Sequence, residues 1–438
     1  MKIGKDFLLT NEYAKTLYNR FASDLSVTDY SCRIPFLKAA NSSPISTVWE
    51  IWQNDESIIR AMRACGTEEK YITGDSSDYE KFRALCGCMP SLPGRSVYLI
   101  AHMALQTFFG CGVDICRENC DFIWNYTADV LQKQHFDADT LLNFLKIDTL
   151  CASADIAELP EKNAISDKIP RILPVVCTDA LLAPHKKEYV TYIKRLSKAT
   201  GVDIDSLSSL ELAIKTSFGI WRSLGCKILR CDISKGFFFE RPDPYHAEQA
   251  FLSVIGKAKK AEYLLTNTLT AQILRILFAQ AKAKGFTVQL CFAGNDSVSD
   301  VDALLAYMKE AKILPKIMLI AEDCSEKMGI YALCEKYSIG YGNMPSIIAG
   351  IGGEIVSDKK LKEELVSFAE GFALGKVAGT VTNASSMSAL LAHDIFKRTL
   401  CSLIGEWMEE GRISNDMMRA GVLIKDICSQ NARSFFDL

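Results

Sequence analysis

Three cysteines lie where short predicted strands end, and their residue type and spacing could support nucleophilic or metal chemistry. Cys177, Cys231 and Cys291 each fall at or near the carboxyl end of an apolar or β-branched run. The strand ends of a parallel barrel face one mouth, so these thiols could form a thiolate metal site or supply a nucleophile. The other interpretation is that small apolar thiols fill a core. We favour it because no histidine or carboxylate with an evident role accompanies them.

Two arginines, Arg33 and Arg230, also fall at predicted strand ends. A guanidinium group stays protonated and binds carboxylate or phosphate through paired hydrogen bonds. The pair could therefore hold an anionic sugar or a phosphate without transforming it. Alternatively, each arginine pairs with a nearby acid such as Asp29 or Asp232 and only fills the cavity. Both interpretations stay open.

The five histidines of the chain offer no evident catalytic centre. His102 falls in a helical stretch and is expected to be a packed helix residue. The other four are expected in loops or helices away from strand ends: His135, His185, His246 and His393. The densest group of thiols lacks the spacing of a paired CxxC zinc site and is interpreted as structural: Cys86, Cys88, Cys111, Cys116 and Cys120.

Eight short apolar runs, most of them followed by a helical stretch, would position the arginines and cysteines. They span residues 27–34, 147–154, 171–178, 226–233, 287–294, 316–322, 338–342 and 378–384. Strands that alternate with helices pair in parallel through crossover helices, and eight of them can close a barrel. The pattern predicts an α/β fold, a (β/α)8 TIM barrel.

More than a hundred residues separate the first run from the second, and this stretch is rich in helix formers and aromatic residues. We therefore predict a single barrel domain over residues 1–438, with a helical insertion over 36–145 after the first strand. Residues 361–369 carry apolar side chains at helical spacing and predict the helix before the last strand.

The charge balance excludes two classes of partner. With 50 basic and 53 acidic residues the formal net charge is −3, which gives no field for nucleic acid or anionic lipid. The first residues lack the apolar core of a signal peptide, and no apolar run approaches the roughly 18 residues of a membrane span. We expect a cytoplasmic protein with reduced thiols.

Several segments, in order along nearly the whole chain, resemble the uronate isomerase family, the glucuronate and galacturonate isomerases among the amidohydrolase-type barrels. They are residues 6–9, 14–18, 49–63, 66–75, 225–227, 285–290, 314–316, 396–407 and 427–432. The resemblance implies an enzyme that converts an aldose uronate to its ketose by moving a proton between adjacent carbons. It also implies a bound divalent cation such as zinc, and a homo-oligomer.

The chain departs from that family at the positions that the resemblance assigns to its site. The metal ligands would be two histidines in a His-Cys-His triplet, a third histidine and an aspartate, and here these positions are Ser31, Arg33, Cys291 and Asn383. The two substrate arginines would stand at Cys177 and Ser385. Serine is a poor zinc ligand, a guanidinium repels a cation, and asparagine lacks the charge of aspartate.

These departures predict a non-catalytic homologue that has no cofactor and binds a small anionic sugar, through Arg33 and Arg230, or a partner protein. The alternative is an active glucuronate or galacturonate isomerase, or an altered enzyme that uses the strand-end cysteines. The metal content would separate the two, since the familiar isomerase reaction needs a cation.

Overall fold

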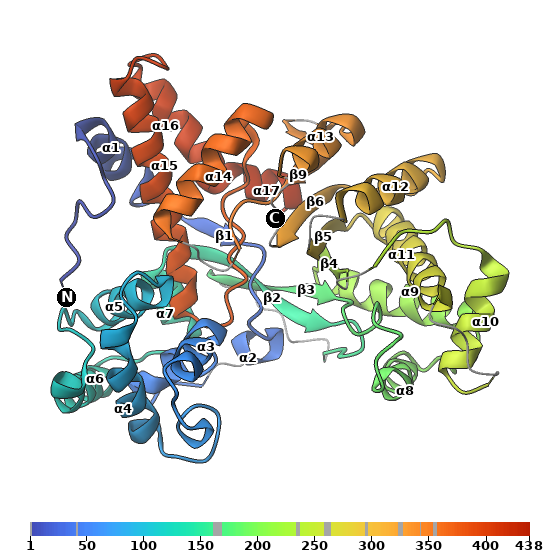
Figure 1. Cartoon of the computed structure of the whole chain (residues 1–438), viewed down its shortest axis with the longest axis horizontal. Helices are drawn as coiled ribbons and strands as arrows, with labels where there is room; N and C mark the ends of the chain where they lie inside the picture. The colour runs from blue at the N-terminus through green and yellow to red at the C-terminus, as the bar shows by residue number, and fades with distance from the viewer. Residues whose placement is uncertain are drawn as a thin grey trace.

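The architecture is built on one curled parallel sheet (Figure 1). The computed structural model describes residues 2–40, 43–160, 169–233, 237–257, 264–293, 297–322, 327–341, 343–353 and 357–438. Seven strands pair in the order β1-β2-β3-β4-β5-β6-β9. They are β1 (Val27–Asp29), β2 (Ile147–Asp155), β3 (Arg171–Cys177), β4 (Ile228–Asp232), β5 (Thr287–Ala293), β6 (Ile317–Glu322) and β9 (Ile347–Ala349). The α/β class is therefore confirmed, with a curled, half-barrel sheet.

Two of the eight predicted strands differ in the structure. The run at 338–342, of which Gly342 lies outside the described residues, forms β7 (Gly340–Tyr341), which pairs antiparallel with β8 (Met344–Pro345). The seventh place in the sheet belongs to β9 instead. All of β9 is buried, as a sheet strand covered on both faces must be, whereas Ile339 is 69% exposed.

The run at 378–384 contributes one bridge, between Val381 and Gly352, rather than a full strand. Asn383 has a φ of 47°, a left-handed conformation that interrupts extended pairing. The segment still lies beside the continuation of β1, because the backbone N–H of Arg33 donates to the carbonyl of Ala384 at 2.8 Å. The continuation of β1 and the segment at 378–384 are thus joined mainly by isolated hydrogen bonds, and they close the barrel-like ring of strands without a regular strand pair.

Helices after β3 to β6 return the chain to the next parallel strand. They are α8 (Tyr189–Thr200), α9 (Leu207–Ser223), α10 (Pro244–Val254), α11 (Leu264–Lys284), α12 (Ser297–Glu310) and α13 (Lys327–Tyr337). The predicted helix at 361–369 is confirmed within α14 (Asp358–Gly371). No helix among the described residues combines the length and the apolar character needed to cross a bilayer.

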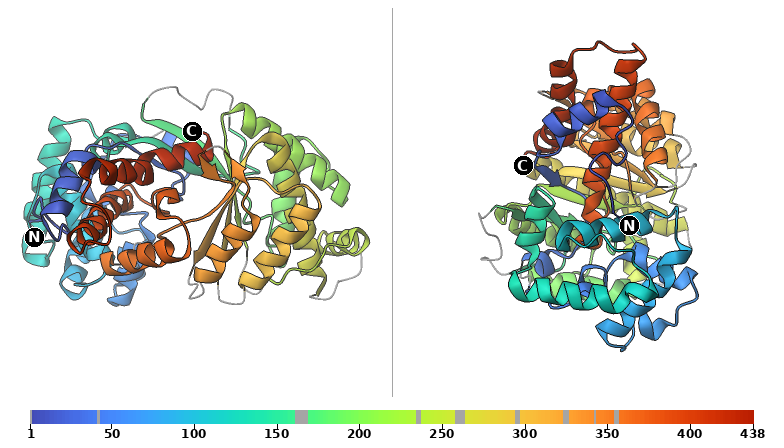
Figure 2. Two further views of the ribbon diagram at one scale, coloured as in Figure 1. Left: turned by 90° about the horizontal axis from the view of Figure 1, so that it is seen from above. Right: turned by 90° about the vertical axis from the view of Figure 1, so that its left-hand side faces the viewer.

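The stretch between β1 and β2 is helical in its described part, with α2 (Phe36–Ala40), α3 (Glu56–Ala64), α4 (Asp78–Cys88), α5 (Ser96–Phe109), α6 (Cys120–Lys133) and α7 (Ala138–Phe144). Figure 2 shows these helices on the opposite side of the sheet from α8 to α12. That residues 36–145 are an insertion within one domain stays a prediction. The packed state of His102 is confirmed, since its Nδ1 lies 2.7 Å from the carbonyl of Tyr98 and its Nε2 accepts from the N–H of Ile115.

Helices from the two ends of the chain pack together beside the sheet (Figure 1). They are α1 (Glu12–Leu17), α15 (Ala392–Glu409), α16 (Met417–Lys425) and α17 (Asn431–Phe436). The carbonyl of Phe435 accepts from Lys316 Nζ at 2.9 Å, directly before β6. Because Lys316 stands at the amino end of its strand, α17 covers the side of the sheet opposite the carboxyl ends.

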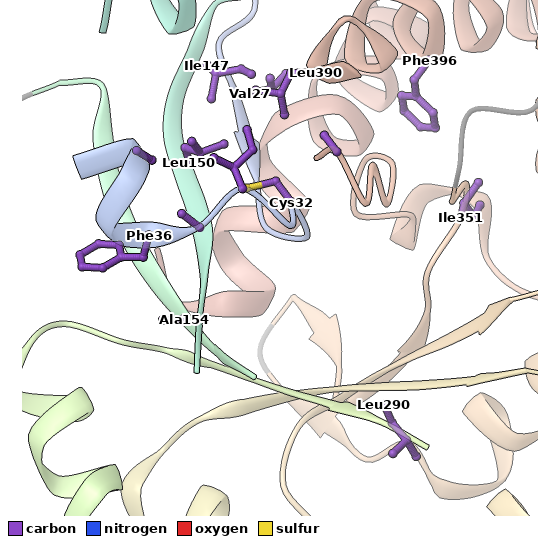
Figure 3. Close-up of a cluster of buried hydrophobic side chains, with 14 of the residues drawn as sticks. Val27, Cys32, Phe36, Ile147, Leu150, Ala154, Leu290, Ile351, Leu390 and Phe396 are labelled. Carbon is purple, nitrogen blue, oxygen red and sulfur yellow. The ribbon is translucent and has the colours of Figure 1, made fainter. Parts of the chain in front are cut away.

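Two apolar clusters fill the two faces of the sheet. The larger one includes Val27, Cys32 and Leu150, which lie together where β1 and β2 run side by side in Figure 3. The smaller, inner cluster contains Tyr30, Val175, Ile228, Cys291, Met318 and Phe436. Alternate residues of a strand face opposite sides of the sheet. Residues at the carboxyl ends of the strands that lie on the same face as the inner cluster therefore point into the opening of the curled sheet, which we call the mouth.

Candidate ligand site at the mouth of the sheet

Asp29, the last residue of β1, organises the turn that follows it. Its Oδ1 accepts from the backbone N–H groups of Ser31 (2.9 Å) and Cys32 (2.8 Å). Its Oδ2 accepts from the Thr382 hydroxyl at 2.6 Å. The Asp29 side chain is 0% exposed. A buried carboxylate needs such donors, and here they connect β1 to the last segment of the ring.

His393 corrects the expectation that every histidine lies away from strand ends. It lies at the start of α15, and its Nε2 is 2.9 Å from Asp29 Oδ2, with only 7% of the imidazole side chain exposed. The other oxygen of Asp29 already accepts two backbone N–H groups. The histidine therefore fastens α15 to the end of β1 and faces a carboxylate rather than the open mouth.

Asp232, at the end of β4, binds both candidate arginines. Arg33 Nη2 donates to its Oδ2 at 3.0 Å, and Arg230 Nε donates to its Oδ1 at 2.9 Å. Arg230 Nη1 also donates to Asn383 Oδ1 at 2.9 Å. The side chains are unequally buried, with Arg230 3% exposed, Asp232 22% and Arg33 34%. The carboxylate that the sequence offered as a possible partner is therefore shared, and Arg33 is the guanidinium nearer solvent.

Opposite charges decide the protonation of Asp232. Burial by itself would raise the pKa of this carboxyl, but the guanidinium groups of Arg230 and Arg33 outweigh burial and hold the pKa below its ordinary value. The Asp232 side chain thus stays ionised at neutral pH. An ionised Asp232 neutralises one of the two guanidinium charges.

The three strand-end cysteines do not converge. Cys177 and Cys291 belong to or pack against the inner cluster, whereas Cys231 is part of the larger cluster on the other face and accepts from the Thr178 hydroxyl at 3.5 Å. Alternation along β4 explains this, because Arg230 and Asp232 take the inner face. Burial raises the pKa of Cys177 to about 11, so its thiol stays protonated at neutral pH. A three-thiolate site is excluded for these residues.

Three of the four positions matched to metal ligands carry side chains that do not fit a zinc ion, namely Ser31, Arg33 and Asn383. The fourth is Cys291, whose side chain hydrogen-bonds to Asp232. Ser31 Oγ accepts from the backbone N–H of Thr382 at 2.9 Å, and the oxygen of Asn383 is taken by Arg230. Two guanidinium groups at one carboxylate would also repel a cation. In the described part of the chain no three histidine, cysteine or acidic side chains group to hold a metal. That these positions correspond to family ligands remains a prediction.

A cavity of ≈ 950 Å³ opens at the mouth beside Arg33 and Asn383. Its described lining has five basic side chains, Arg33, Arg60, Arg95, Lys327 and Lys360, and two acidic ones, Glu56 and Glu364. The last of the sequence candidates, Ser385, lines a smaller neighbouring pocket, where its Oγ accepts from the backbone N–H of Glu56 at 3.0 Å. The arrangement can bind an anion, because guanidinium groups pair with carboxylate and phosphate oxygens.

Comparison with known proteins finds relatives over nearly the whole chain. The family model described as glucuronate isomerase matches residues 1–297 and 291–436. The chain belongs to the glucuronate isomerase family. A uronate isomerase from Caldanaerobacter subterraneus subsp. tengcongensis is 28% identical, over 99% of this chain and 98% of the relative. One from Brachyspira hyodysenteriae is 26% identical over 99% of both chains.

Solved structures of the glucuronate isomerase family share the fold. The crystal structure of uronate isomerase from Thermotoga maritima matches with a TM-score of 0.89 and 22% identity, over 100% of both chains. That of glucuronate isomerase from Caulobacter crescentus matches with a TM-score of 0.85 and 16% identity, over 99% of this chain and 96% of the other. These likenesses support the barrel-type architecture that the resemblance implied.

Asp179 lies two residues after β3, at the mouth of the sheet. The sequence interpretation did not single it out. Its Oδ1 is buried and has no hydrogen-bond partner among the described residues. Burial and the neighbouring charge of Asp232 raise the pKa of Asp179 to about 6, against the opposing effect of Arg230. Its place was the available signal, because Asp179 follows the end of a predicted strand closely, and Asp29 and Asp232 are the last residues of their strands.

The raised pKa of Asp179 predicts that the charged form of this side chain destabilises the folded protein, and that the effect depends on pH. The folded protein binds a proton there more tightly than the unfolded chain, so this contribution to stability is full below about pH 4 and is lost as pH rises through about 6. Asp179→Asn removes the charge and should raise the Tm by about 1–3 °C at pH 8, with a difference near zero at pH 4. Thermal unfolding at both pH values checks this. An equal shift at both would show that the charge of Asp179 is not the cause.

Proposed function

We propose that this chain binds a sugar acid of the uronate type in the mouth cavity and does so without a divalent cation. The basic lining of the cavity beside the Arg33–Asp232–Arg230 network carries the proposal. Arg33 contacts the carboxylate of the ligand, because it lines the cavity and is the more exposed guanidinium. Arg230 acts as a positioning residue through Asp232 and Asn383. This refines the sequence interpretation, in which both arginines grip the anion.

Isomerisation of glucuronate or galacturonate is the second candidate function. The printed names of the relatives favour it over a non-catalytic role. Asp179 favours it as well, since a carboxyl with a pKa of about 6 suits proton transfer near neutral pH. Moving a proton between adjacent carbons needs such a base and an electrophile for the carbonyl oxygen, and a guanidinium can supply positive charge there. The non-catalytic role is supported only by the residue types at the four positions matched to metal ligands.

Calorimetric titration of chelator-treated protein with glucuronate and with galacturonate tests the binding proposal. We expect saturable binding, and Arg33→Gln should weaken it about 10- to 100-fold, because hydrogen bonds to charged groups contribute about 1.5–3 kcal/mol. Lys359→Gln, an exposed lysine of α14 outside the cavity lining, is the matched control and should change nothing. Failure to bind either sugar acid, or equal binding by the Arg33 variant, would overturn the proposal.

Conversion of the same two sugars, with and without added zinc or manganese, separates the two candidates. Turnover on the order of 1–1000 per second without metal would establish an isomerase. Asp179→Asn should then reduce kcat by about 100-fold or more while ligand affinity is kept. Binding without conversion under every metal condition would leave the non-catalytic role.

A further inference from the structure

We infer that the mouth cavity takes a sugar acid with a second anionic group, a phosphate or a second carboxylate, at the end of the cavity that Arg95 and Lys360 line. The inference rests on the proposed function and adds the class of ligand. Arg95 comes from the helical segment between β1 and β2, Lys360 comes from α14, and both line the same cavity as Arg33.

The described lining holds five basic and two acidic side chains, and one of the acidic ones, Glu56, also lines the smaller neighbouring pocket together with Ser96 at the start of α5. The remaining basic charge exceeds what one carboxylate needs. Lys327 and Glu364 neutralise each other in an ion pair of 2.6 Å. Arg33 is already paired with Asp232 and serves the first carboxylate. In the part of the chain that the structure describes, neither Arg95 nor Lys360 has an acidic side chain within ion-pair distance. A simple uronate has one anionic group, so these two basic side chains would face only hydroxyl groups of such a ligand.

The size of the cavity agrees with a larger ligand. At ≈ 950 Å³ it lies near the upper end of the range of about 300–1,000 Å³ in which drug-sized ligands are buried. A single hexuronate is smaller than such ligands and would leave space at one end. Arg95 lies directly before α5 and Lys360 in the first turn of α14, so two separate elements contribute basic side chains to the lining.

The backbone near Arg95 adds to the positive character of this end. Arg95 occupies the N-cap position of α5, and its side chain makes no capping hydrogen bond because a guanidinium offers no acceptor. The first amide groups of α5, at Ser96 and Val97, thus lack a side-chain acceptor from that position. The helix dipole favours an anion there. The basic side chains of the cavity carry the inference, and the helix start is consistent with it.

Calorimetric titration with three probes tests the inference: glucuronate, glucarate and glucuronate 1-phosphate. Glucarate and glucuronate 1-phosphate each carry two anionic groups and are called dianions for that reason, although the phosphate alone has a charge of about −1.5 to −2 at pH 7. We expect one or both of them to bind at least 10-fold more tightly than glucuronate at low salt, with the difference shrinking as salt is raised. The glucarate and phosphate arms distinguish a second carboxylate from a phosphate. The double variant Arg95→Gln/Lys360→Gln should lower the affinity for the preferred dianion about 10-fold and that for glucuronate less than twofold.

Matched variants separate the two proposals. Lys359→Gln makes the same lysine-to-glutamine change on α14, at a residue outside the cavity lining, and it should leave the affinities for all three probes unchanged. Arg33→Gln should weaken binding of every probe. Equal affinity for glucuronate and both dianions, unaffected by the double variant, would overturn this inference and leave the proposed function standing. If no probe bound, both proposals would fail.

Discussion

Replacing Asp232 with alanine is expected to lower the free energy of unfolding by about 3–5 kcal/mol, because it leaves a buried arginine without its counter-ion. Arg230 is 3% exposed, and its Nε donates to Asp232 at 2.9 Å. Urea unfolding at pH 7 measures the loss, and calorimetry with glucuronate should show weakened binding as well, since Arg33 loses the same partner.

A double-mutant cycle identifies the cause of that loss. In the Asp232→Ala background, Arg230→Met removes the unpaired charge and should recover a large part of the stability. Glu69→Ala is the control, because it breaks the solvent-exposed pair with Arg63 and should leave the stability nearly unchanged. A loss after Asp232→Ala that Arg230→Met does not recover would mean that packing, and not the buried charge, holds this part of the mouth together.

Local patterns made most of the sheet predictable. Apolar runs of five to nine residues, such as β2 (Ile147–Asp155), were long enough to stand out. β9 was missed because it has three residues and follows Pro345 and Ser346, which read as a turn. The last predicted strand does not form, because the backbone at Asn383 is left-handed and the segment makes only one bridge. No local sequence pattern predicts that conformation.

The side-chain contacts at the mouth of the sheet were predictable only where the two residues in contact are close in the sequence. Arg230 and Asp232 are two residues apart on one strand, so they share a face, and their pairing was one of the two interpretations considered. Arg33 lies 199 residues from the same carboxylate, and His393 lies 364 residues from Asp29. Such contacts follow from the closing of the ring, which places segments side by side without any local signal. The burial that raises the pKa of Asp179 has the same origin.

Replacing Asp29 with alanine is expected to have an effect of similar size, about 3–5 kcal/mol of unfolding free energy. Four donors lose their acceptor at once: the backbone N–H groups of Ser31 and Cys32, the Thr382 hydroxyl and His393 Nε2. All lie in a region closed to water.

Asp29 also holds the turn that carries Arg33, so its loss should weaken sugar-acid binding beyond the loss of stability. Urea unfolding together with calorimetry on the folded fraction separates the two effects. Asp24→Ala is the matched control, because the side chain of this aspartate is 89% exposed, and it should leave the stability nearly unchanged. If Asp29→Ala behaved like Asp24→Ala, the end of β1 would be held by packing alone, and the positioning of Arg33 would have to come from Asp232.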